Sequence, residues 1–437
     1  MNITVNFGEK TGKIKAMHGI GQPPFTSGNS SMMNYLKEAG IPYSRLHDVG
    51  GAYGGYVYVD IPNIFRNFDA PEDEPSSYDF AFTDWLIKSL LENGSEPIFR
   101  FGITIENCVN IKAYRTGPPK DYGKWARICG KIISHYNQGW AEGFYFNIKY
   151  WEIWNEPDLD AEDAEFKHNW NSTAKEFYRL YAVAAVYLKK IFPKLKIGGP
   201  SLSMATERSF EWFENFLKYI TTYDEYVPLD FLSWHSYWNM FGAAKMSGIL
   251  KSRLLEYGYT ETELMLNEWN NSWRPETRGT LKAAAKAAGM MLVMQKTETN
   301  ILAYYDARLG ISNYAGMFNP LSREPFPLYY SFKAFNELYK LENEVRCSTD
   351  EITYTDEEDG LKKRNVLCAA AEKNGACAIM IANIGDETVK VNILADDMDI
   401  IEILVIDETH LLNKAAFIGK EILLAGNSVV LIKGTKA

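Results

Sequence analysis

Tyr150-Trp151-Glu152-Ile153-Trp154-Asn155-Glu156-Pro157-Asp158 begins as a β-strand and ends in a carboxylic acid. Aromatic and β-branched residues alternate with polar ones at its start, which is typical of a strand. Pro157 cannot donate to a strand ladder and restricts the residue before it, so we expect the strand to end at Glu156. A second stretch has the same form, with an apolar strand that ends in a Glu between Asn and Trp: Leu264-Met265-Leu266-Asn267-Glu268-Trp269-Asn270.

Strand-like segments alternate with helical segments through most of the chain. Strands that alternate with helices form a parallel sheet, and eight such units predict an α/β fold, the (β/α)8 TIM barrel. An open doubly wound sheet is the alternative, but its Gly-rich fingerprint is missing after the first strand. The predicted strands are 16–21, 43–48, 97–102, 150–156, 196–200, 230–237, 264–268 and 300–306.

The pattern changes after about residue 343, where short alternating strands are separated by turn residues. This pattern predicts an accessory antiparallel β-sandwich. A further strand at residues 2–7 has no place in the barrel. The expected domains are an N-terminal strand that joins the sandwich (1–15), a catalytic barrel (16–342) and a C-terminal β-sandwich (343–437).

The two glutamates fall where a barrel carries its chemistry. Catalytic residues of this fold sit at the C-terminal ends of strands. Glu156 ends the fourth predicted strand and Glu268 the seventh, whereas Glu261 and Glu263 lie at the opposite end of the seventh. Retaining hydrolysis of a glycosidic bond needs two such carboxyls about 5–5.5 Å apart. A serine hydrolase is poorly supported, because Gly-x-Ser-x-Gly does not occur.

Three motifs resemble a known family. Trp154-Asn155-Glu156-Pro157 on strand four, with a Glu at the end of strand seven, is similar to the clan A glycoside hydrolases. Arg45-Leu46-His47 on strand two and His235-Ser236-Tyr237 on strand six extend the resemblance to glycoside hydrolase family 39. That family contains β-xylosidases and α-L-iduronidases. The resemblance spans the barrel and implies hydrolysis with retention of configuration.

The resemblance also implies roles for individual residues. Glu156 takes the role of general acid/base, Glu268 that of nucleophile, and Asn155 that of a ligand for the 2-hydroxyl of the sugar. Tyr237 or His235 would hold Glu268 by a hydrogen bond and keep its pKa low. The remaining candidate substrate-binding residues are Arg45, which could hold Glu268 by its charge, His47 and Asp306, which suit sugar hydroxyls, and the rings of Trp269 and Phe101.

These candidates also have structural interpretations. His235 on an apolar strand fits a hydrogen-bonded core histidine equally well, and His47 and Asp306 are equally open. For Trp269 and Phe101 we favour core packing over a role as apolar platforms for sugar.

Two further features concern buried charge and metals. Glu152 lies within the fourth strand and is expected to face inward, paired with a cation such as Arg45 or Arg100. The histidines show no metal-ligand spacing. The proposed chemistry needs no metal and no cofactor.

The composition indicates which kinds of partner and which cellular compartment to expect. A net charge of −10 argues against nucleic acid as a partner, whereas 14% aromatic residues suit sugar rings. The apolar run 180–188 is too short to span a bilayer, and no secretory signal is recognised at the N-terminus, so we expect a cytoplasmic protein without membrane association. Five cysteines without a Cys-x-x-Cys pair indicate free thiols in a reducing compartment: Cys108, Cys129, Cys347, Cys368 and Cys377.

The sequence therefore predicts a retaining exo-glycosidase, β-xylosidase-like, that acts on small oligosaccharides or glycosides. An endo-acting glycanase of the clan is one alternative. A non-catalytic carbohydrate-binding barrel is another, although a binding protein has no need for a matched acid and nucleophile. Homo-oligomerisation stays open, because exposed aromatic surface suits either sugar or a second copy of the chain.

Overall fold

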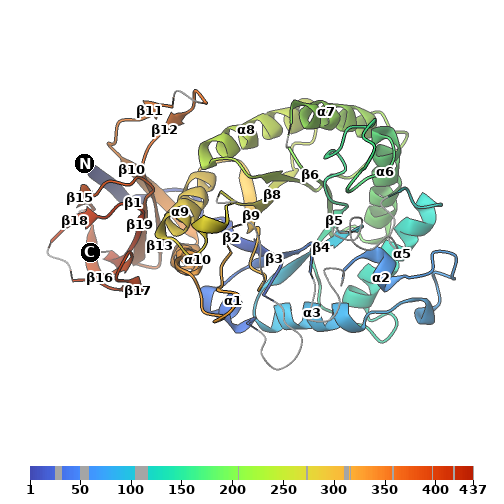
Figure 1. The fold of residues 1–437 in the computed structure, drawn as a ribbon, viewed down its shortest axis with the longest axis horizontal. Coiled ribbons are helices and arrows are strands. Elements are labelled where there is room, and N and C mark those ends of the chain that lie inside the picture. Colours follow the sequence, from blue (N-terminus) through green and yellow to red (C-terminus); the bar gives the residue numbers. More distant parts are fainter. Residues whose placement is uncertain are drawn as a thin grey trace.

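A closed barrel packs against a smaller β-structure in this computed structural model (Figure 1). Both termini lie in the smaller part. The structure describes residues 1–24, 32–49, 59–103, 117–204, 206–271, 274–309, 314, 316–356, 359–395, 397–416 and 419–436.

The barrel consists of eight parallel strands, and its last strand pairs with its first. The predicted TIM barrel is therefore confirmed. The strands are β2 (Ala16–Gly21), β3 (Tyr43–Leu46), β4 (Glu96–Phe101), β5 (Tyr150–Ile153), β6 (Lys196–Leu202), β7 (Phe231–Ser236), β8 (Glu263–Trp269) and β9 (Thr299–Tyr304).

Most of the long helices begin at a side-chain cap. Asp121 accepts a hydrogen bond from the Lys124 backbone N–H at 2.9 Å, which satisfies a donor that the first turn leaves without a partner. No helix in the described part of the chain is long and apolar enough to cross a bilayer. The helices are α1 (Asn34–Ala39), α2 (Ile61–Ile64), α3 (Ala81–Glu92), α5 (Tyr122–Gln138), α6 (Ala174–Ile191), α7 (Glu207–Thr221), α8 (Met240–Glu256), α9 (Leu281–Gln295) and α10 (Pro327–Tyr339), with short 3-10 turns at Pro75–Ser77 and Pro275–Thr277.

The inside of the barrel changes from apolar to polar along its axis. Ile98, Tyr150, Phe231 and Met265 form part of an apolar layer near the strand starts. Two positions further along β5 the inward side chain is the fully buried Glu152. The polar groups therefore gather toward the C-terminal ends of the strands, which is where barrel enzymes place their sites.

The smaller part is a single nine-stranded sheet that encloses its own core. Side chains from β1, β10, β14, β15 and β18 share that core, among them Ile3, Val345, Ile379, Ile393 and Leu424. The predicted β-sandwich is thus present, with one departure: β1 runs parallel to β15, whereas its other neighbour β10 is antiparallel. A separate hairpin pairs β11 (Tyr354–Thr355) with β12 (Lys362–Lys363). In the nine-stranded sheet the strand order is β17 (Leu411–Lys414), β16 (Met398–Ile406), β19 (Ser428–Lys436), β14 (Ala376–Asn383), β13 (Val366–Lys373), β10 (Asn343–Thr349), β1 (Asn2–Lys13), β15 (Val389–Leu394) and β18 (Glu421–Leu424).

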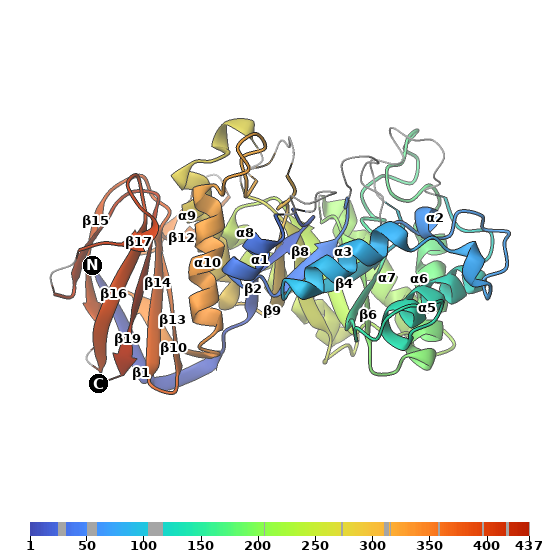
Figure 2. The same ribbon diagram turned by 90° about the horizontal axis from the view of Figure 1, so that it is seen from below.

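Helices α9 and α10 join the two parts, and Figure 2 shows α10 between the barrel and the sandwich. Ala369, Met380 and Leu431 on the outer face of the sandwich belong to the same apolar cluster as these helices. Lys433 of β19 also donates to Glu337 of α10 at 2.6 Å. The sandwich therefore covers one flank of the barrel.

Candidate active site

Glu156 sits three residues beyond the end of β5, because that strand ends at Ile153 and not at Glu156 as predicted. Trp154 and Glu156 have φ angles of 76° and 45°, which a strand cannot accommodate. The Glu156 N–H donates to the Ser201 carbonyl at 2.8 Å and so fixes the turn against β6. Left-handed backbone at residues other than glycine collects at functional sites.

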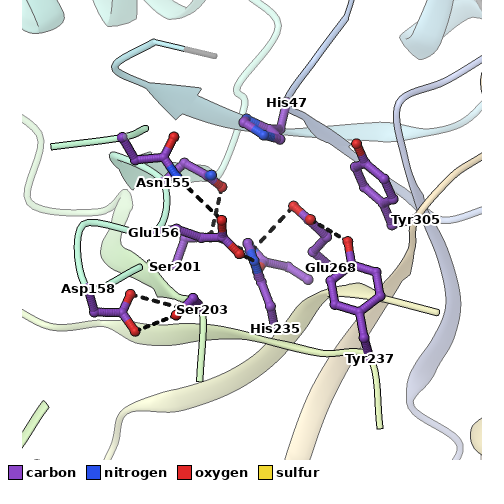
Figure 3. A network of polar contacts seen from close by, with 12 residues as sticks. His47, Asn155, Glu156, Asp158, Ser201, Ser203, His235, Tyr237, Glu268 and Tyr305 are labelled. Carbon is purple, nitrogen blue, oxygen red and sulfur yellow. Dashed lines mark hydrogen bonds and ion pairs between the residues drawn. The ribbon is translucent and has the colours of Figure 1, made fainter. Parts of the chain in front are cut away.

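The Glu156 carboxyl lies in a nearly closed polar setting (Figure 3). Its Oε1 is 2.6 Å from His235 Nδ1, and Asn169 Nδ2 donates to its Oε2 at 3.3 Å. Burial and the charge of Asp158 raise the pKa of Glu156 to about 8, although the Arg45 guanidinium opposes them. Glu156 is therefore largely protonated at neutral pH and able to act as an acid.

Asp158 lies two residues after Glu156, and its side chain is held by Ser203, which directly follows β6. Its carboxylate accepts hydrogen bonds from the backbone N–H and the hydroxyl of Ser203, at 2.9 and 2.7 Å. The side chain is almost fully buried. Its fixed position keeps a negative charge near Glu156, which favours the protonated form of that acid.

Glu268 is aimed into the barrel by an irregularity in β8. Trp234 pairs with Leu266 across the sheet, but His235 pairs with Glu268, so β8 carries one extra residue, Asn267. A bulge of this kind turns two consecutive side chains to the same face. Asn267 Nδ2 donates to Glu152 at 2.5 Å, while the carboxylate of Glu268 meets Arg45 one residue later.

Arg45 of β3 connects four strand ends. Its Nε donates to Glu152 at 2.8 Å and its Nη1 to Glu268 at 2.9 Å. Its Nη2 donates to Asn155 Oδ1 at 2.6 Å and to Ser201 Oγ at 2.7 Å. The expected pairing of Glu152 with Arg45 is confirmed. A buried guanidinium needs such a set of acceptors to offset the loss of its hydration.

The environment of Glu268 differs from the expectation in one respect. Tyr237 donates to its Oε1 at 2.6 Å, and Arg45 occupies its Oε2, as expected for groups that stabilise the carboxylate. Burial nevertheless raises the pKa of Glu268 above its usual value, with His235, Arg45 and Tyr237 pulling the other way. The expectation of a low pKa was wrong, because desolvation outweighs these partners.

His235 is a neutral link between the acid and β6. Burial lowers its pKa to about 4. Its Nε2 lies 2.7 Å from Ser201 Oγ, while Nδ1 faces Glu156. A neutral imidazole donates from one nitrogen and accepts at the other, so its tautomer must match the protonation state of Glu156.

The two glutamates lie close together on opposite sides of His235 (Figure 3). One carboxylate oxygen of each and one His235 nitrogen all lie within 4.8 Å of one another. Three such atoms are also a conceivable metal site. A cation there would be repelled by the Arg45 guanidinium, 2.9 Å from Glu268.

A sequence model for glycosyl hydrolases family 39 matches residues 24–309, which cover nearly all of the barrel. This chain belongs to glycosyl hydrolases family 39. Two β-xylosidases are similar to it: the protein of Caldicellulosiruptor saccharolyticus is 28% identical over 306 residues, which are 63% of this chain and 57% of that protein. The protein of Geobacillus stearothermophilus is 28% identical over 237 residues, 52% of this chain and 41% of that protein. The chain thus matches about half the length of these relatives.

Solved structures share the whole architecture of this family 39 chain. A glucosidase from Croceicoccus marinus has a TM-score of 0.78 at 20% identity, covering 100% of this chain and 99% of that one. A family 39 β-xylosidase from Caulobacter crescentus has a TM-score of 0.69 at 17% identity, covering 100% of both chains. At these identities the likeness shows the fold, barrel and sandwich together.

Two other candidate residues of the family 39 barrel, His47 and Asp306, make no hydrogen bond to either glutamate within the described part of the chain. His47 follows β3 and faces the pair in Figure 3, with Nε2 3.2 Å from Asp48 Oδ1. Burial lowers the pKa of His47 well below its usual value, so it is neutral. Asp306 follows β9 and pairs with Arg308 at 3.0 Å. Burial raises the pKa of Asp306 to about 6, despite that pair.

Trp269 and Phe101 are not apolar platforms for sugar, because both rings are fully buried. Trp269 packs edge-on against Tyr304, with ring centroids 4.9 Å apart. Phe101 stacks on Trp151 at 5.4 Å. The favoured interpretation of core packing is confirmed for both.

Sequence reasoning missed four polar residues of the site. Ser201 and Ser203 follow Gly199-Pro200 at the end of β6, and this position on the mouth of the barrel was a usable signal. Asn267 lies two residues after the inward-facing Met265 on β8, so the alternation of the strand was a usable signal for it. Asn169 lies in the loop before α6, and nothing in the sequence indicates its approach to Glu156.

Proposed function

We propose that this chain is a retaining exo-glycosidase that removes terminal glycosyl residues from small oligosaccharides or glycosides, in the manner of a β-xylosidase. The observation that carries the proposal is the pair Glu156 and Glu268. Their nearest oxygens lie within 4.8 Å, which is close to the short carboxyl separation of retaining enzymes, about 5–5.5 Å, and far below that of inverting ones. An inverting enzyme needs room for a water molecule, about 6.5–9.5 Å.

In the first step Glu156 protonates the leaving oxygen while Glu268 attacks the anomeric carbon. The raised pKa of Glu156 supplies the proton at neutral pH. Arg45 and Tyr237 each hold one oxygen of Glu268, which orients the nucleophile toward the substrate. Asn155 gives its Oδ1 to Arg45, so its Nδ2 is the group that would bind a sugar hydroxyl.

In the second step Glu156, now ionised, takes a proton from the water that attacks the glycosyl ester of Glu268. The ionised carboxylate needs a donor, and His235 Nδ1–H at 2.6 Å supplies one. Ser201 donates to Nε2 of the same tautomer, so no proton has to leave the imidazole. The proton taken from water restores the acid form of Glu156, Glu268 is released from the ester, and the sugar leaves with its configuration retained.

The β-xylosidases named above favour a β-D-xyloside as the first substrate to test. Nitrophenyl glycosides of both anomers, over pentoses, hexoses and uronic acids, should be screened with the wild-type protein, Glu156→Ala and Glu268→Ala. We expect turnover of one sugar, its loss in Glu268→Ala, and recovery of Glu156→Ala turnover by azide. The recovered product is a glycosyl azide of the same anomeric configuration as the substrate.

The two alternatives give different results in the same experiments. An endo-acting enzyme would ignore monosaccharide glycosides and cut xylo-oligosaccharides internally, whereas the proposed enzyme releases monomer only. A carbohydrate-binding barrel would bind sugar without turnover. Release of the inverted anomer, or full activity of Glu268→Ala, would refute the proposed mechanism.

A further inference from the structure

A cavity of about 980 Å³ lies where the sandwich meets α9, away from the two glutamates. Its wall is strongly basic although the chain as a whole carries a net charge of −10. Among the described residues, its lining includes one carboxylate, that of Glu344, and six cations: Lys13, Lys15, Lys296, Arg346, Lys362 and Arg364. Three of these cations are paired with carboxylates, Lys13 with Glu342, Lys296 with Glu344 and Arg346 with Glu9.

Two cysteines open on this cavity from neighbouring strands. β10 and β13 are antiparallel neighbours whose last paired residues are Val345 and Ala370, and two residues beyond that pair on each strand come Cys347 and Cys368, which both line the cavity. Both thiols are partly buried, and they are hydrogen-bonded to each other. Facing residues of an antiparallel pair have Cα atoms about 4.5–5.5 Å apart, a separation that a disulfide spans.

The two thiols have unequal character. The hydrogen bond from Cys347, helped by the charges of Lys296 and Arg364, lowers the pKa of Cys368 despite its burial. The same hydrogen bond raises the pKa of Cys347. Because the thiolate is the reactive form, Cys368 is the nucleophile of the pair and Cys347 the second, resolving thiol.

We propose that Cys347 and Cys368 form a redox-active dithiol, and that the basic cavity guides anionic disulfides of the glutathione class to it. The Cys368 thiolate attacks one sulfur of the oxidant, forms a mixed disulfide and releases one anionic thiolate, which takes the proton of Cys347. The Cys347 thiolate then attacks the Cys368 sulfur, forms the Cys347–Cys368 disulfide and releases the second thiolate, which is protonated by solvent. Two thiols lose two electrons, and one molecule of oxidant becomes two thiols.

The disulfide would close a loop that contacts the segment between β7 and α8, next to the proposed active site. The hairpin β11–β12 lies between the two cysteines in the chain. Asp359, in this loop, accepts a hydrogen bond from Asn239 at 3.0 Å, and Asn239 lies two residues after Tyr237. This consequence alone depends on the proposed function; the thiol chemistry does not.

The test treats the full chain with glutathione disulfide and follows intact mass and peptide maps. Cys108 lies outside the described residues, so every sample carries Cys108→Ser. We expect this parent protein to lose two hydrogen atoms and yield a linked Cys347–Cys368 peptide. Cys347→Ser should stop at a glutathione adduct on Cys368, and Cys368→Ser should react far more slowly. Cys129, fully buried in α5, should stay reduced and serves as the internal control.

The guiding role of the cavity has its own measurement. Arg364→Gln should slow the reaction with glutathione disulfide several-fold more than the reaction with neutral hydroxyethyl disulfide, and added salt should reduce the difference. Equal effects on the two oxidants would overturn the anionic preference. A stable glutathione adduct on the parent protein, or no reaction at all, would overturn the dithiol.

Discussion

Replacing Tyr237 by Phe removes one hydrogen bond from Glu268, the proposed nucleophile, and leaves the ring in place. The hydroxyl donates to Glu268 Oε1 at 2.6 Å. The ring contacts Tyr305 and Tyr314, with centroids 6.2 and 5.1 Å away, and a phenyl ring keeps both contacts. The change therefore removes the hydrogen bond to the Glu268 carboxylate, together with the hydrogen bond between the Tyr237 and Tyr314 hydroxyls.

A hydrogen bond to a charged group contributes about 1.5–3 kcal/mol net. The loss raises the pKa of Glu268 further, because the carboxylate loses a hydrogen-bond donor. The proposed nucleophile acts as the anion, so the acidic limb of kcat/KM moves to higher pH. On this limb activity falls by roughly 10- to 150-fold, and the loss shrinks as pH rises.

The assay is kcat/KM for an activated glycoside across the acidic and neutral range, for wild type and Tyr237→Phe. Tyr136→Phe is the matched control, because Tyr136 is a buried tyrosine whose hydroxyl donates to Asp84 at 2.8 Å, away from the glutamates. Its profile should keep the wild-type shape. A uniform loss at every pH in Tyr237→Phe would refute the reasoning, since it would mean misplacement of Glu268 and not a change in its ionisation.

Four further outcomes are expected. The basic limb of the wild-type profile should fall near pH 8, the pKa of the acid, and Glu156→Gln should remove this limb along with most of the activity toward poor leaving groups. Arg45→Met should cost about 3–5 kcal/mol in urea unfolding because it strands the buried charge of Glu152, and adding Glu152→Gln should recover part of that loss. Trp269→Phe should lower stability, by an amount below the roughly 3–5 kcal/mol of a Trp→Ala change, without raising KM; a raised KM at unchanged stability would restore Trp269 as a substrate contact. Burial lowers the pKa of His18 from 6.5 to about 4, so unfolding stability should be full above pH 6.5 and fall by about 3 kcal/mol as pH drops toward 4; His18→Asn should flatten this dependence.

The strand positions and the two glutamates could be predicted because both depend on local pattern. Apolar runs separated by helices give the barrel, and Pro157 marks a turn with Glu156 before it. The turn itself begins earlier than predicted, since Trp154 already has left-handed backbone. A proline restricts the residue before it, but says nothing about the one three positions earlier.

The side chains that contact the two glutamates could not be predicted, because their orientation depends on strand irregularities that the simple alternation of inward and outward side chains does not reveal. The extra residue in β8 turns Asn267 and Glu268 to the same face, whereas simple alternation sends one of them outward. The register of β6 also shifts between Gly199 and Leu202, which brings Ser201 to the site. The depth of Trp269 depends likewise on neighbours from β9 and α10.

Arg45 ties the catalytic geometry to barrel closure, since one side chain from β3 holds groups on β5, β8 and the end of β6. A folded barrel thus already holds Glu268, the proposed nucleophile, in its orientation. The sequences of segments that follow the strands can then change, in evolution or in the laboratory, without changing the contacts that Arg45 makes. Exchanging segments that follow the barrel strands between family 39 members should accordingly change the sugar preference while the proposed reaction centre stays the same.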